Sequence, residues 1–481
     1  MMDTFASARA IVQPVEASAP PESVLVLTAA GRDPAVLETV RPSTVCGRFS
    51  IFARDPVETF TVSDDSDDQA GTPIRRLVRR VAGFPALDAP PESVPFAGGW
   101  IGYLAYEAGL VGQRVPPRPP AASTIPLVRF GLYDHVLVFD HTDERWYACA
   151  IDWPEAWRLE RPPVEHRLDT LRKRLYAAEA SRLAPPPEPE TAIPVANISR
   201  EAYRIKVARA IDYIRAGDIY QVNLTQRFSA RTDASPLELY RRLRRFNPSP
   251  QAAFLQWDEG AIVSASPELF LDVCDRRVVT RPIKGTRPRV GDEIIDATRR
   301  RELDESEKER AELTMIVDLL RNDLGRVCEY GSIRVTDPGA IEEHPTVLHR
   351  VATIEGRLSP DRGWADLLEA ALPGGSVTGA PKIRAMQIIR ELEPTPRSVY
   401  CGSIGWIGLD GNLSLNIAIR TMVQRGSTVH VHAGGAIVAE SDPQREYEEI
   451  QAKAAGMFAA LKVGQAPRRV RSRRRKEVSA A

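Results

Sequence analysis

Short runs of hydrophobic residues, alternating with polar ones or nearly continuous, mark the N-terminal part of the chain. Three of them, SVLVLTA (23–29), GRFSIFA (47–53) and HVLVFDHTDERWYACAIDW (135–153), have the composition of β-strands. The third run contains two alternating stretches on either side of the polar residues 141–144. This pattern predicts a β-hairpin that turns at these four residues.

The C-terminal part opens with a helical pattern. Ser199 is a suitable N-cap and Gly217 a suitable end for this helix. A polar stretch from about 297 to 324 predicts a second helix, which Gly325 ends. The apolar face of the first helix consists of Tyr203, Val207, Ile211 and Ile214, and strand-like runs lie between the two helices at 220–228, 252–257, 261–266 and 268–273.

The remaining pattern continues to mix the two kinds of element. A glycine-rich turn at 373–382 precedes a helix at 383–392, and a hairpin follows with Asp410 and Gly411 at its tip. Another strand and a final helix complete the pattern. Because strands and helices are intermixed without regular βαβ alternation, the sequence predicts an α+β fold with large antiparallel sheets.

A proline- and acid-rich stretch, RLAPPPEPETAIP (182–194), interrupts the globular pattern and should be extended and solvated. We take it as a boundary, with an N-terminal domain at 20–180, a linker at 181–196 and a catalytic domain at 197–464. The alternative is a long loop over the surface of a single domain. Residues 465–481 form a basic tail that we expect to be disordered.

Composition excludes several classes of protein. The 481 residues have a formal net charge of zero, which favours neither nucleic acid nor an anionic membrane. The five cysteines form no CxxC pair, so a disulfide framework or a zinc site is not expected. No apolar run approaches the roughly 18 residues of a spanning helix, and the N-terminus lacks a signal-peptide pattern. These features predict a cytoplasmic protein.

Two pairs of glutamates stand out as candidate metal ligands. Glu309 and Glu312 lie three residues apart, as do Glu446 and Glu449, and Lys453 follows four residues later. At this spacing each pair projects from one face of a helix. If the helices meet, four carboxylates suit Mg²⁺, which prefers hard oxygen ligands. The alternative for each pair is a solvated helix face.

The string RPIKGTRPR (281–289) is the second candidate. Its prolines stiffen the chain and Gly285 lets a ligand approach the backbone, so the amine of Lys284 would have a fixed direction. A lysine in a loop is more often a surface charge; a buried one near a metal can become a nucleophile. The turn at 374–381 is a further candidate, because backbone N–H groups and hydroxyls in such a turn can bind an anion. His349, taken alone, is more typical of a structural histidine than of a catalytic one.

Several strings together resemble the chorismate-utilising enzymes, in particular component I of aminodeoxychorismate synthase and component I of anthranilate synthase. The similarity extends from about residue 24 to 464. It is strongest in DIYQVNLTQRF (218–228), SASPELFL (264–271), PIKGTRPR (282–289), IVDLLRNDLGR (316–326), PGGSVTGAPKIRAM (373–386), YCGSIGWI (400–407) and AGGAIVAESDPQREYEEIQAKA (433–454).

The resemblance implies a fold and a set of roles. The fold would be two large, mainly antiparallel sheets packed face to face with helices outside. Glu312 and Glu449 match carboxylates that hold Mg²⁺, and Glu309 and Glu446 match partners acting directly or through water. His349 matches a histidine beside the departing groups, and Glu268 a proton-shuttling carboxylate at the 4-hydroxyl. Substrate-contacting positions match Gly285, Thr286, Ser376, Tyr400, Arg420, Gly434, Gly435 and Lys453, with Tyr400 and Arg420 at the enolpyruvyl carboxylate.

Lys284 distinguishes the two enzymes within this resemblance, because anthranilate synthases typically carry alanine there. A lysine that adds at ring carbon 2 and expels the 4-hydroxyl leaves an adduct that ammonia can displace at carbon 4. The sequence therefore predicts an amine-transferring enzyme that makes 4-amino-4-deoxychorismate, the route to 4-aminobenzoate and folate. Anthranilate synthase is the alternative; isochorismate or salicylate synthases use a lysine elsewhere. An alternative from a different functional class is a protein that binds nucleic acid through its basic C-terminal tail.

The resemblance also implies partners. In this chain no cysteine nucleophile lies in a glycine-rich elbow. The resemblance implies a separate glutamine amidotransferase subunit that would supply ammonia as the other half of a heterodimer. No lyase segment is present. Relatives that bind tryptophan carry a serine in the N-terminal sheet, and the stretch matched to it, Val26 to Ala30, has none. Tryptophan binding is therefore not expected.

Overall fold

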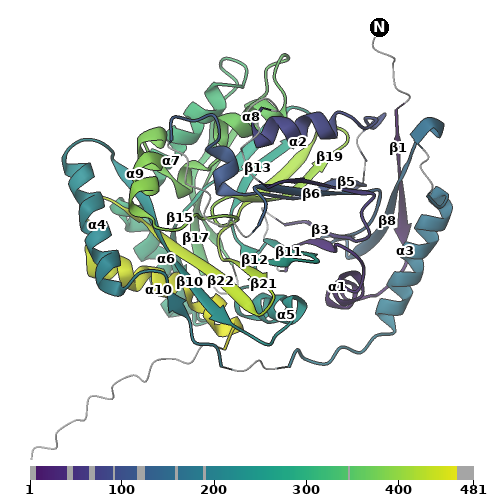
Figure 1. Cartoon of the computed structure of the whole chain (residues 1–481), viewed down its shortest axis with the longest axis horizontal. Helices are drawn as coiled ribbons and strands as arrows, with labels where there is room; N and C mark the ends of the chain where they lie inside the picture. Colours follow the sequence, from purple (N-terminus) through teal and green to yellow (C-terminus); the bar gives the residue numbers. More distant parts are fainter. Residues whose placement is uncertain are drawn as a thin grey trace, which may run out of the picture.

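The computed structural model describes residues 7–40, 47–63, 71–89, 91, 93–115, 125–157, 161–187, 191–344 and 347–462. Two large antiparallel sheets dominate this part of the chain (Figure 1). The first sheet has twelve strands: β1 (Arg9–Val15), β8 (Arg145–Asp152), β7 (His135–Asp140), β3 (Phe49–Ala53), β2 (Ala35–Glu38), β11 (Gln251–Trp257), β12 (Gly260–Ser266), β21 (Thr421–Arg425), β22 (Thr428–Ile437), β10 (Gln221–Arg231) and β18 (Gly379–Ala380) in spatial order, with β9 (Val195–Ala196) also paired to β10.

The second sheet has ten strands in the described residues. Their spatial order is β15 (Ile283–Pro288), β17 (Val347–Arg357), β14 (Arg277–Arg281), β13 (Leu269–Cys274), β20 (Leu413–Ile417), β19 (Ser403–Gly408), β5 (Gly99–Leu104), β6 (Val128–Tyr133) and β4 (Glu58–Val62), with β16 (Arg334–Glu343) paired to β17. The main cluster of buried side chains contains residues of both sheets, such as Phe52, Leu224, Trp100 and Leu271. The sheets therefore share one core, and the predicted α+β fold with two large antiparallel sheets is confirmed.

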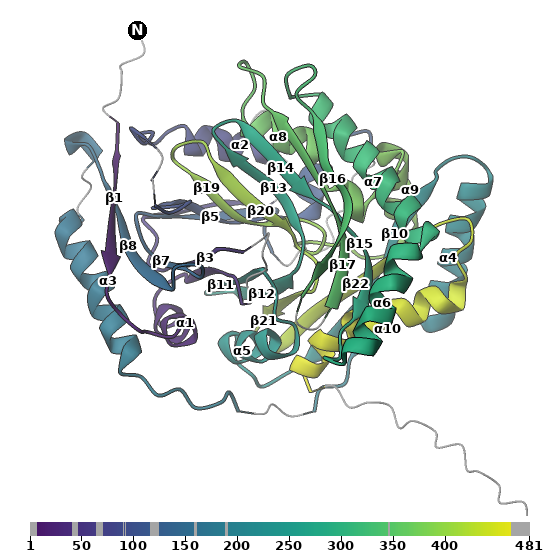
Figure 2. The same cartoon turned by 180° about the vertical axis from the view of Figure 1, so that it is seen from behind.

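Helices cover the outside of this core (Figure 2). α10 packs on β22 and against α4 and α5, whereas α7 packs on β15, β16 and β17. These two helices flank the pocket described below. The helices are α1 (Pro21–Ala29), α2 (Pro73–Val81), α3 (Val164–Glu179), α4 (Arg200–Arg215), α5 (Pro236–Phe246), α6 (Glu293–Glu305), α7 (Glu307–Gly325), α8 (Trp364–Ala371), α9 (Lys382–Leu392) and α10 (Pro443–Ala460), with short 3-10 turns η2 (Tyr106–Gly109), η3 (Glu155–Trp157) and η4 (Gly375–Val377).

Local signals predicted several elements correctly. The helix expected after Ser199 is α4, and the Ser199 hydroxyl accepts a hydrogen bond from the Ala202 backbone N–H at 3.1 Å. The hairpins expected around residues 141–144 and at the tip Asp410-Gly411 are β7–β8 and β19–β20. In each case the turn residues and the alternation of the flanking strands agree.

Two predicted elements were wrong in type or extent. SVLVLTA is the helix α1 rather than a strand, because a short apolar run fits either structure and Pro21 occupies a position that favours helix starts. The stretch matched to the tryptophan-binding strand, Val26 to Ala30, thus lies in α1 and its C-cap. The single helix expected at 297–324 is two helices, since Ser306 leaves the helical conformation and caps α7 through Glu309 N–H at 3.4 Å.

Both sheets contain strands from before and after residues 181–196. Our division of the chain at that segment stays a prediction. The expected basic tail at 465–481 lies outside the described residues. Among the described helices, none combines the length and the apolar character needed to span a lipid bilayer.

Candidate active site

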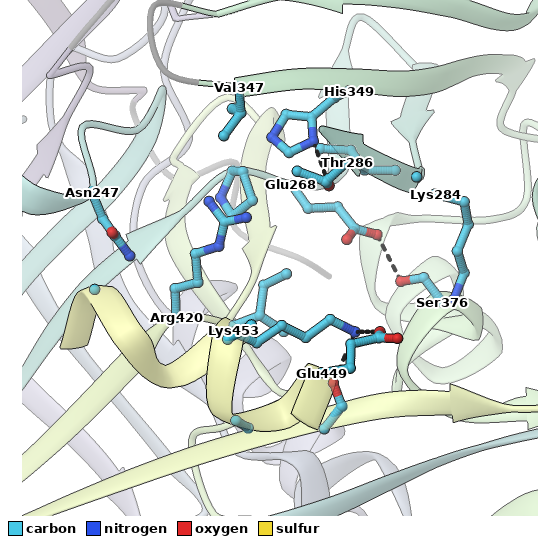
Figure 3. Close-up of a pocket in the computed structure, with 18 of the residues that line it drawn as sticks. Asn247, Glu268, Lys284, Thr286, Val347, His349, Ser376, Arg420, Glu449 and Lys453 are labelled. Carbon is cyan, nitrogen blue, oxygen red and sulfur yellow. Dashed lines mark hydrogen bonds and ion pairs between the residues drawn. The ribbon is translucent and has the colours of Figure 1, made fainter. Parts of the chain in front are cut away.

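A cavity of about 850 Å³ lies between α7, α10 and the strands β15, β17 and β22 (Figure 3). Its walls contain residues far apart in the sequence, because both sheets and both helices contribute to it. Most of the predicted site residues line this cavity: Glu268, Lys284, Gly285, Thr286, Glu309, Glu312, His349, Ser376, Tyr400, Arg420, Gly434, Glu449 and Lys453. Gly435 and Glu446 are not part of the lining but lie next to it, since an ideal Cβ on Gly435 would be 3.3 Å from Glu446 Oε2 and 3.5 Å from Oε1 of the lining residue Glu449.

Lys284 projects from β15 into this cavity rather than into bulk water. Its side chain is half-buried, and burial lowers the pKa of its ammonium group, an effect that Glu312 opposes and Lys453 strengthens. The next residue, Gly285, has a φ of +83°, a conformation that favours glycine. A Cβ there would lie 2.8 Å from Leu303 Cδ1, so the backbone beside Lys284 fits closely against α6.

Glu268 lies at the start of β13 and is 5% exposed. The Ser376 hydroxyl donates a hydrogen bond to its Oε1 at 2.6 Å. Burial raises the pKa of Glu268 to about 7, and the hydrogen bond from Ser376 and the charge of Lys284 limit the rise. A carboxyl group with this pKa can both give and take a proton near neutral pH.

His349 lies on β17 opposite Thr286 of β15. Its Nδ1 and the Thr286 hydroxyl are 2.9 Å apart, and the side chain is 2% exposed. Burial holds the pKa of His349 well below its usual range, and the nearby Arg420 lowers it further. The imidazole is therefore neutral around pH 7 and can act as a hydrogen-bonding group without adding charge.

Arg420 and Tyr400 form another wall of the cavity. Arg420 has a φ of +50°, which costs a non-glycine residue about 1–3 kcal/mol and is characteristic of functional positions. Tyr400 stacks on His432, with ring centroids 5.2 Å apart and an interplanar angle of 13°. The guanidinium and the fixed phenol together suit an anionic group of a ligand.

The two glutamate pairs lie on α7 and α10 as predicted, and each carboxylate has a polar or cationic neighbour. Arg287 donates to Glu309 Oε1 at 2.8 Å, and the Ser441 hydroxyl donates to Glu446 Oε1 at 2.6 Å. The other two carboxylates pair with lysines of their own helices, Lys308 Nζ with Glu312 Oε1 at 3.8 Å and Lys453 Nζ with Glu449 Oε1 at 2.6 Å. The cluster is thus partly neutralised by side chains.

The glutamates suit a hard cation because their donor atoms are carboxylate oxygens and two of these oxygens are buried. Glu309 Oε2 and Glu446 Oε2 are buried and accept no hydrogen bond within the described residues, a costly state that an ion would relieve. Burial raises the pKa of Glu446, and an ion would offset that effect. In the part of the chain that the structure describes, however, no three acidic, histidine or cysteine side chains are already close enough to hold a metal.

The cavity also contains polar residues that the sequence did not single out: Asn223, Asn247, Arg287, Lys308, His344 and His432. His432 precedes the noted Ala433-Gly434-Gly435 string on β22, and Asn247 follows α5 just before Pro248. For His432 and Asn247, the only signal in the sequence was their position next to a glycine-rich or proline-rich turn. Such positions are too common in sequences to identify cavity residues without the fold.

Comparisons with known proteins agree on one family. A family model described as chorismate binding enzyme matches residues 39–459. Anthranilate synthase component 1 of Thermus thermophilus is 41% identical, over 87% of this chain and 90% of its own length. Aminodeoxychorismate synthase component 1 of Klebsiella aerogenes is 39% identical, over 84% of this chain and 86% of its own length.

Solved structures give the same picture. Anthranilate synthase component I of Streptococcus pneumoniae superposes with a TM-score of 0.73 at 33% sequence identity, covering 87% of this chain and 94% of the other. The isochorismate synthase MenF of Escherichia coli has a TM-score of 0.68 at 19% identity, a likeness of fold alone. Relatives with two different specificities are thus similarly close, and overall similarity does not separate them.

Proposed function

The chain belongs to the chorismate-binding enzyme family, and from this premise we propose that it aminates chorismate to 4-amino-4-deoxychorismate, the precursor of 4-aminobenzoate in folate synthesis. The ammonia would come from a glutamine amidotransferase subunit. One observation carries the proposal: Lys284 extends into the cavity, and its ammonium pKa is lowered by burial. A neutral amine in this position is a nucleophile.

Lys284 begins the proposed reaction by adding its neutral Nζ to ring carbon 2 of chorismate. Both double bonds of the ring diene shift by one position, and the carbon–oxygen bond at carbon 4 breaks. Glu268, which is half protonated near pH 7, gives its proton to the departing 4-hydroxyl, which leaves as water. The product of this half-reaction is a covalent adduct with Lys284.

Ammonia completes the proposed reaction by attacking carbon 4. Both double bonds shift back, and Nζ of Lys284 departs with the electron pair of its bond to carbon 2. Glu268, now a carboxylate, accepts the surplus proton of the incoming nitrogen. The sum is exchange of a hydroxyl for an amino group with release of water, and both residues return to their starting state.

Other residues would bind and orient the substrate. Arg420 and Tyr400 would hold the enolpyruvyl carboxylate, because they combine a cation with a fixed hydroxyl. His349, kept neutral by burial, would hydrogen-bond near the departing group without opposing protonation of Glu268. The remaining proposed contacts are the backbone or side chains of Gly285, Thr286, Ser376, Gly434, Gly435 and Lys453.

We propose that Glu312 and Glu449 hold Mg²⁺, assisted by Glu309 and Glu446. Bound there, the ion would withdraw electron density from the ring through its carboxylate and favour attack at carbon 2. The two unpartnered buried oxygens, Glu309 Oε2 and Glu446 Oε2, support this assignment. Gly285 and Gly435 leave room beside them, since a Cβ on either residue would lie 3.0–3.3 Å from one of these oxygens.

Anthranilate synthesis is the second candidate, because the Thermus thermophilus relative with that activity is 41% identical. It requires ammonia, rather than a lysine amine, to add at carbon 2. The two functions are separated by incubating the chain with chorismate, Mg²⁺ and an ammonium salt and identifying the product by mass spectrometry. Formation of 4-amino-4-deoxychorismate, and its loss in Lys284→Ala, supports the proposal. Anthranilate as the wild-type product contradicts it.

A further inference from the structure

Asn247 follows the last residue of α5, and its backbone N–H caps that helix by donating to Leu243 O at 2.7 Å. Its carboxamide points into the cavity on the same side as Arg420, across from Lys284 and Ser376 (Figure 3). No hydrogen bond to the carboxamide is formed within the described residues. A polar group without a partner, directed into a substrate cavity, is available to a ligand.

Gly456 of α10, which has no side chain, leaves the space that this carboxamide occupies. An ideal Cβ on Gly456 would lie 1.9 Å from Asn247 Oδ1 and 2.5 Å from its Nδ2. No side chain larger than hydrogen fits there while Asn247 keeps its position. Glycine inside a helix is less favourable than alanine, yet α10 has glycine at this point of closest approach. The carboxamide therefore lies against the helix backbone at Gly456.

Glu449 of α10 lies beside Lys453 on one side of the cavity, while Arg420 and Asn247 lie on another side, away from Lys284. The side that holds Glu449 is the acidic end. A substrate with two carboxylates, one directed to the acidic end through a cation, would place its second carboxylate toward Arg420. A carboxamide N–H can donate to this anion without adding a charge that the substrate would have to neutralise.

We infer that Asn247 donates a hydrogen bond from Nδ2 to the side-chain carboxylate of the substrate, and that Gly456 is the positioning residue for this contact. The inference rests on the proposed use of chorismate but not on the amination chemistry. It would hold equally for an enzyme of this family that makes another product. Binding measurements can therefore test it separately from catalysis.

Calorimetric titration in Mg²⁺ with two stable probes provides the test. The first is an aromatic dicarboxylate with a carboxyvinyloxy group meta to its ring carboxylate, and the second is benzoate, which has the ring carboxylate alone. We expect Asn247→Ala to weaken the dicarboxylate roughly tenfold, in keeping with one hydrogen bond to a charged group, and to leave benzoate unchanged. Asn247→Asp should weaken the dicarboxylate further, because it replaces the donor by a negative charge.

Gly456→Ala should reproduce the effect of Asn247→Ala, because its methyl displaces the carboxamide. The double variant should bind no more weakly than either single one. Gly325→Ala, whose Cβ would only meet Ile333 Cδ1 at 3.8 Å, is the matched glycine control. Gln387→Ala removes a carboxamide outside the cavity and is the matched amide control. Circular dichroism would verify that each variant is folded.

Unchanged dicarboxylate affinity in both Asn247 variants would overturn the assignment. Equal weakening of benzoate would overturn it too, since Asn247 would then act on the ring carboxylate or on the pocket as a whole. Normal binding by Gly456→Ala beside weak binding by Asn247→Ala would refute the positioning role. A wild-type product other than 4-amino-4-deoxychorismate would disprove the proposed function but leave these binding differences in place.

Discussion

The Ser376 hydroxyl donates a 2.6 Å hydrogen bond to Glu268 Oε1, inside the wall of the cavity. This contact joins the glycine-rich turn around η4 to the start of β13, two segments more than a hundred residues apart. It also favours the ionised form of a carboxyl group whose pKa burial raises to about 7. The bond therefore adjusts the protonation of Glu268 to neutral conditions.

Removing this bond should move the pH dependence of the reaction. Ser376→Ala takes away an interaction with the charged carboxylate, so the pKa of Glu268 should rise further above its present value of about 7. If protonated Glu268 is the acid, the alkaline limb of kcat/KM against pH should shift to higher pH. An unchanged limb would show that another group controls it.

Glu268 should also affect stability in a pH-dependent way. Its folded pKa, about 7, is above the unfolded value, so its contribution is complete below the unfolded pKa and is lost as pH rises through the folded pKa. Glu268→Gln keeps the shape without the titration. Between about pH 5 and 8, thermal unfolding of wild type should lose stability relative to this variant. Parallel curves would contradict the assignment.

Lys284→Arg should abolish formation of 4-amino-4-deoxychorismate as completely as Lys284→Ala does. Arginine preserves a positive charge and a long side chain, but its guanidinium stays protonated and cannot attack carbon 2. Stopped-reaction mass spectrometry of wild type should detect a protein adduct that neither variant forms. Full activity in Lys284→Arg would show that Lys284 acts only through its charge and would contradict its role as a nucleophile.

Lys308 should compete with Mg²⁺ for the glutamates. Its Nζ is 3.8 Å from Glu312 Oε1. Its charge opposes the rise that burial causes in the pKa of Glu446 and adds to the lowering of the pKa of Glu449 on the facing helix. Lys308→Met removes this competing cation, so Mg²⁺ should bind the substrate-free protein several-fold more tightly in calorimetry. The exposed Lys173→Met on α3 is the control. Weaker binding in Lys308→Met would mean that the lysine supports the metal.

Arg397→Met should destabilise the fold strongly. Arg397 and Glu393 are almost completely buried and paired at 2.7 Å, and Arg397 also donates to the carbonyls of Val377 and Asn223. Loss of one partner of a buried pair costs about 3–5 kcal/mol. Arg204→Ala, which breaks the exposed pair with Glu201, should cost less than about 1 kcal/mol. Urea unfolding would compare the two.

The sequence by itself determined the features that depend on neighbouring residues. Ser199 predicted the start of α4 because a cap needs only a hydroxyl and the next turn of helix. The alternation around residues 141–144 predicted a hairpin for the same local reason. The three-residue spacing of Glu309 and Glu312 placed both carboxylates on one helix face, and the resemblance to a family brought separate strings into one expected site.

Only the tertiary structure decided what depends on packing between distant segments. The apolar run SVLVLTA could be buried as strand or helix, and its packing against α3, β2 and β3 selected the helix α1. The raised pKa of Glu268 requires burial and a hydroxyl from residue 376. The position of the Asn247 carboxamide requires a glycine at 456, because a Cβ there would collide with it. Desolvation and close contact arise only when the folded chain excludes water from these places, which local sequence does not encode.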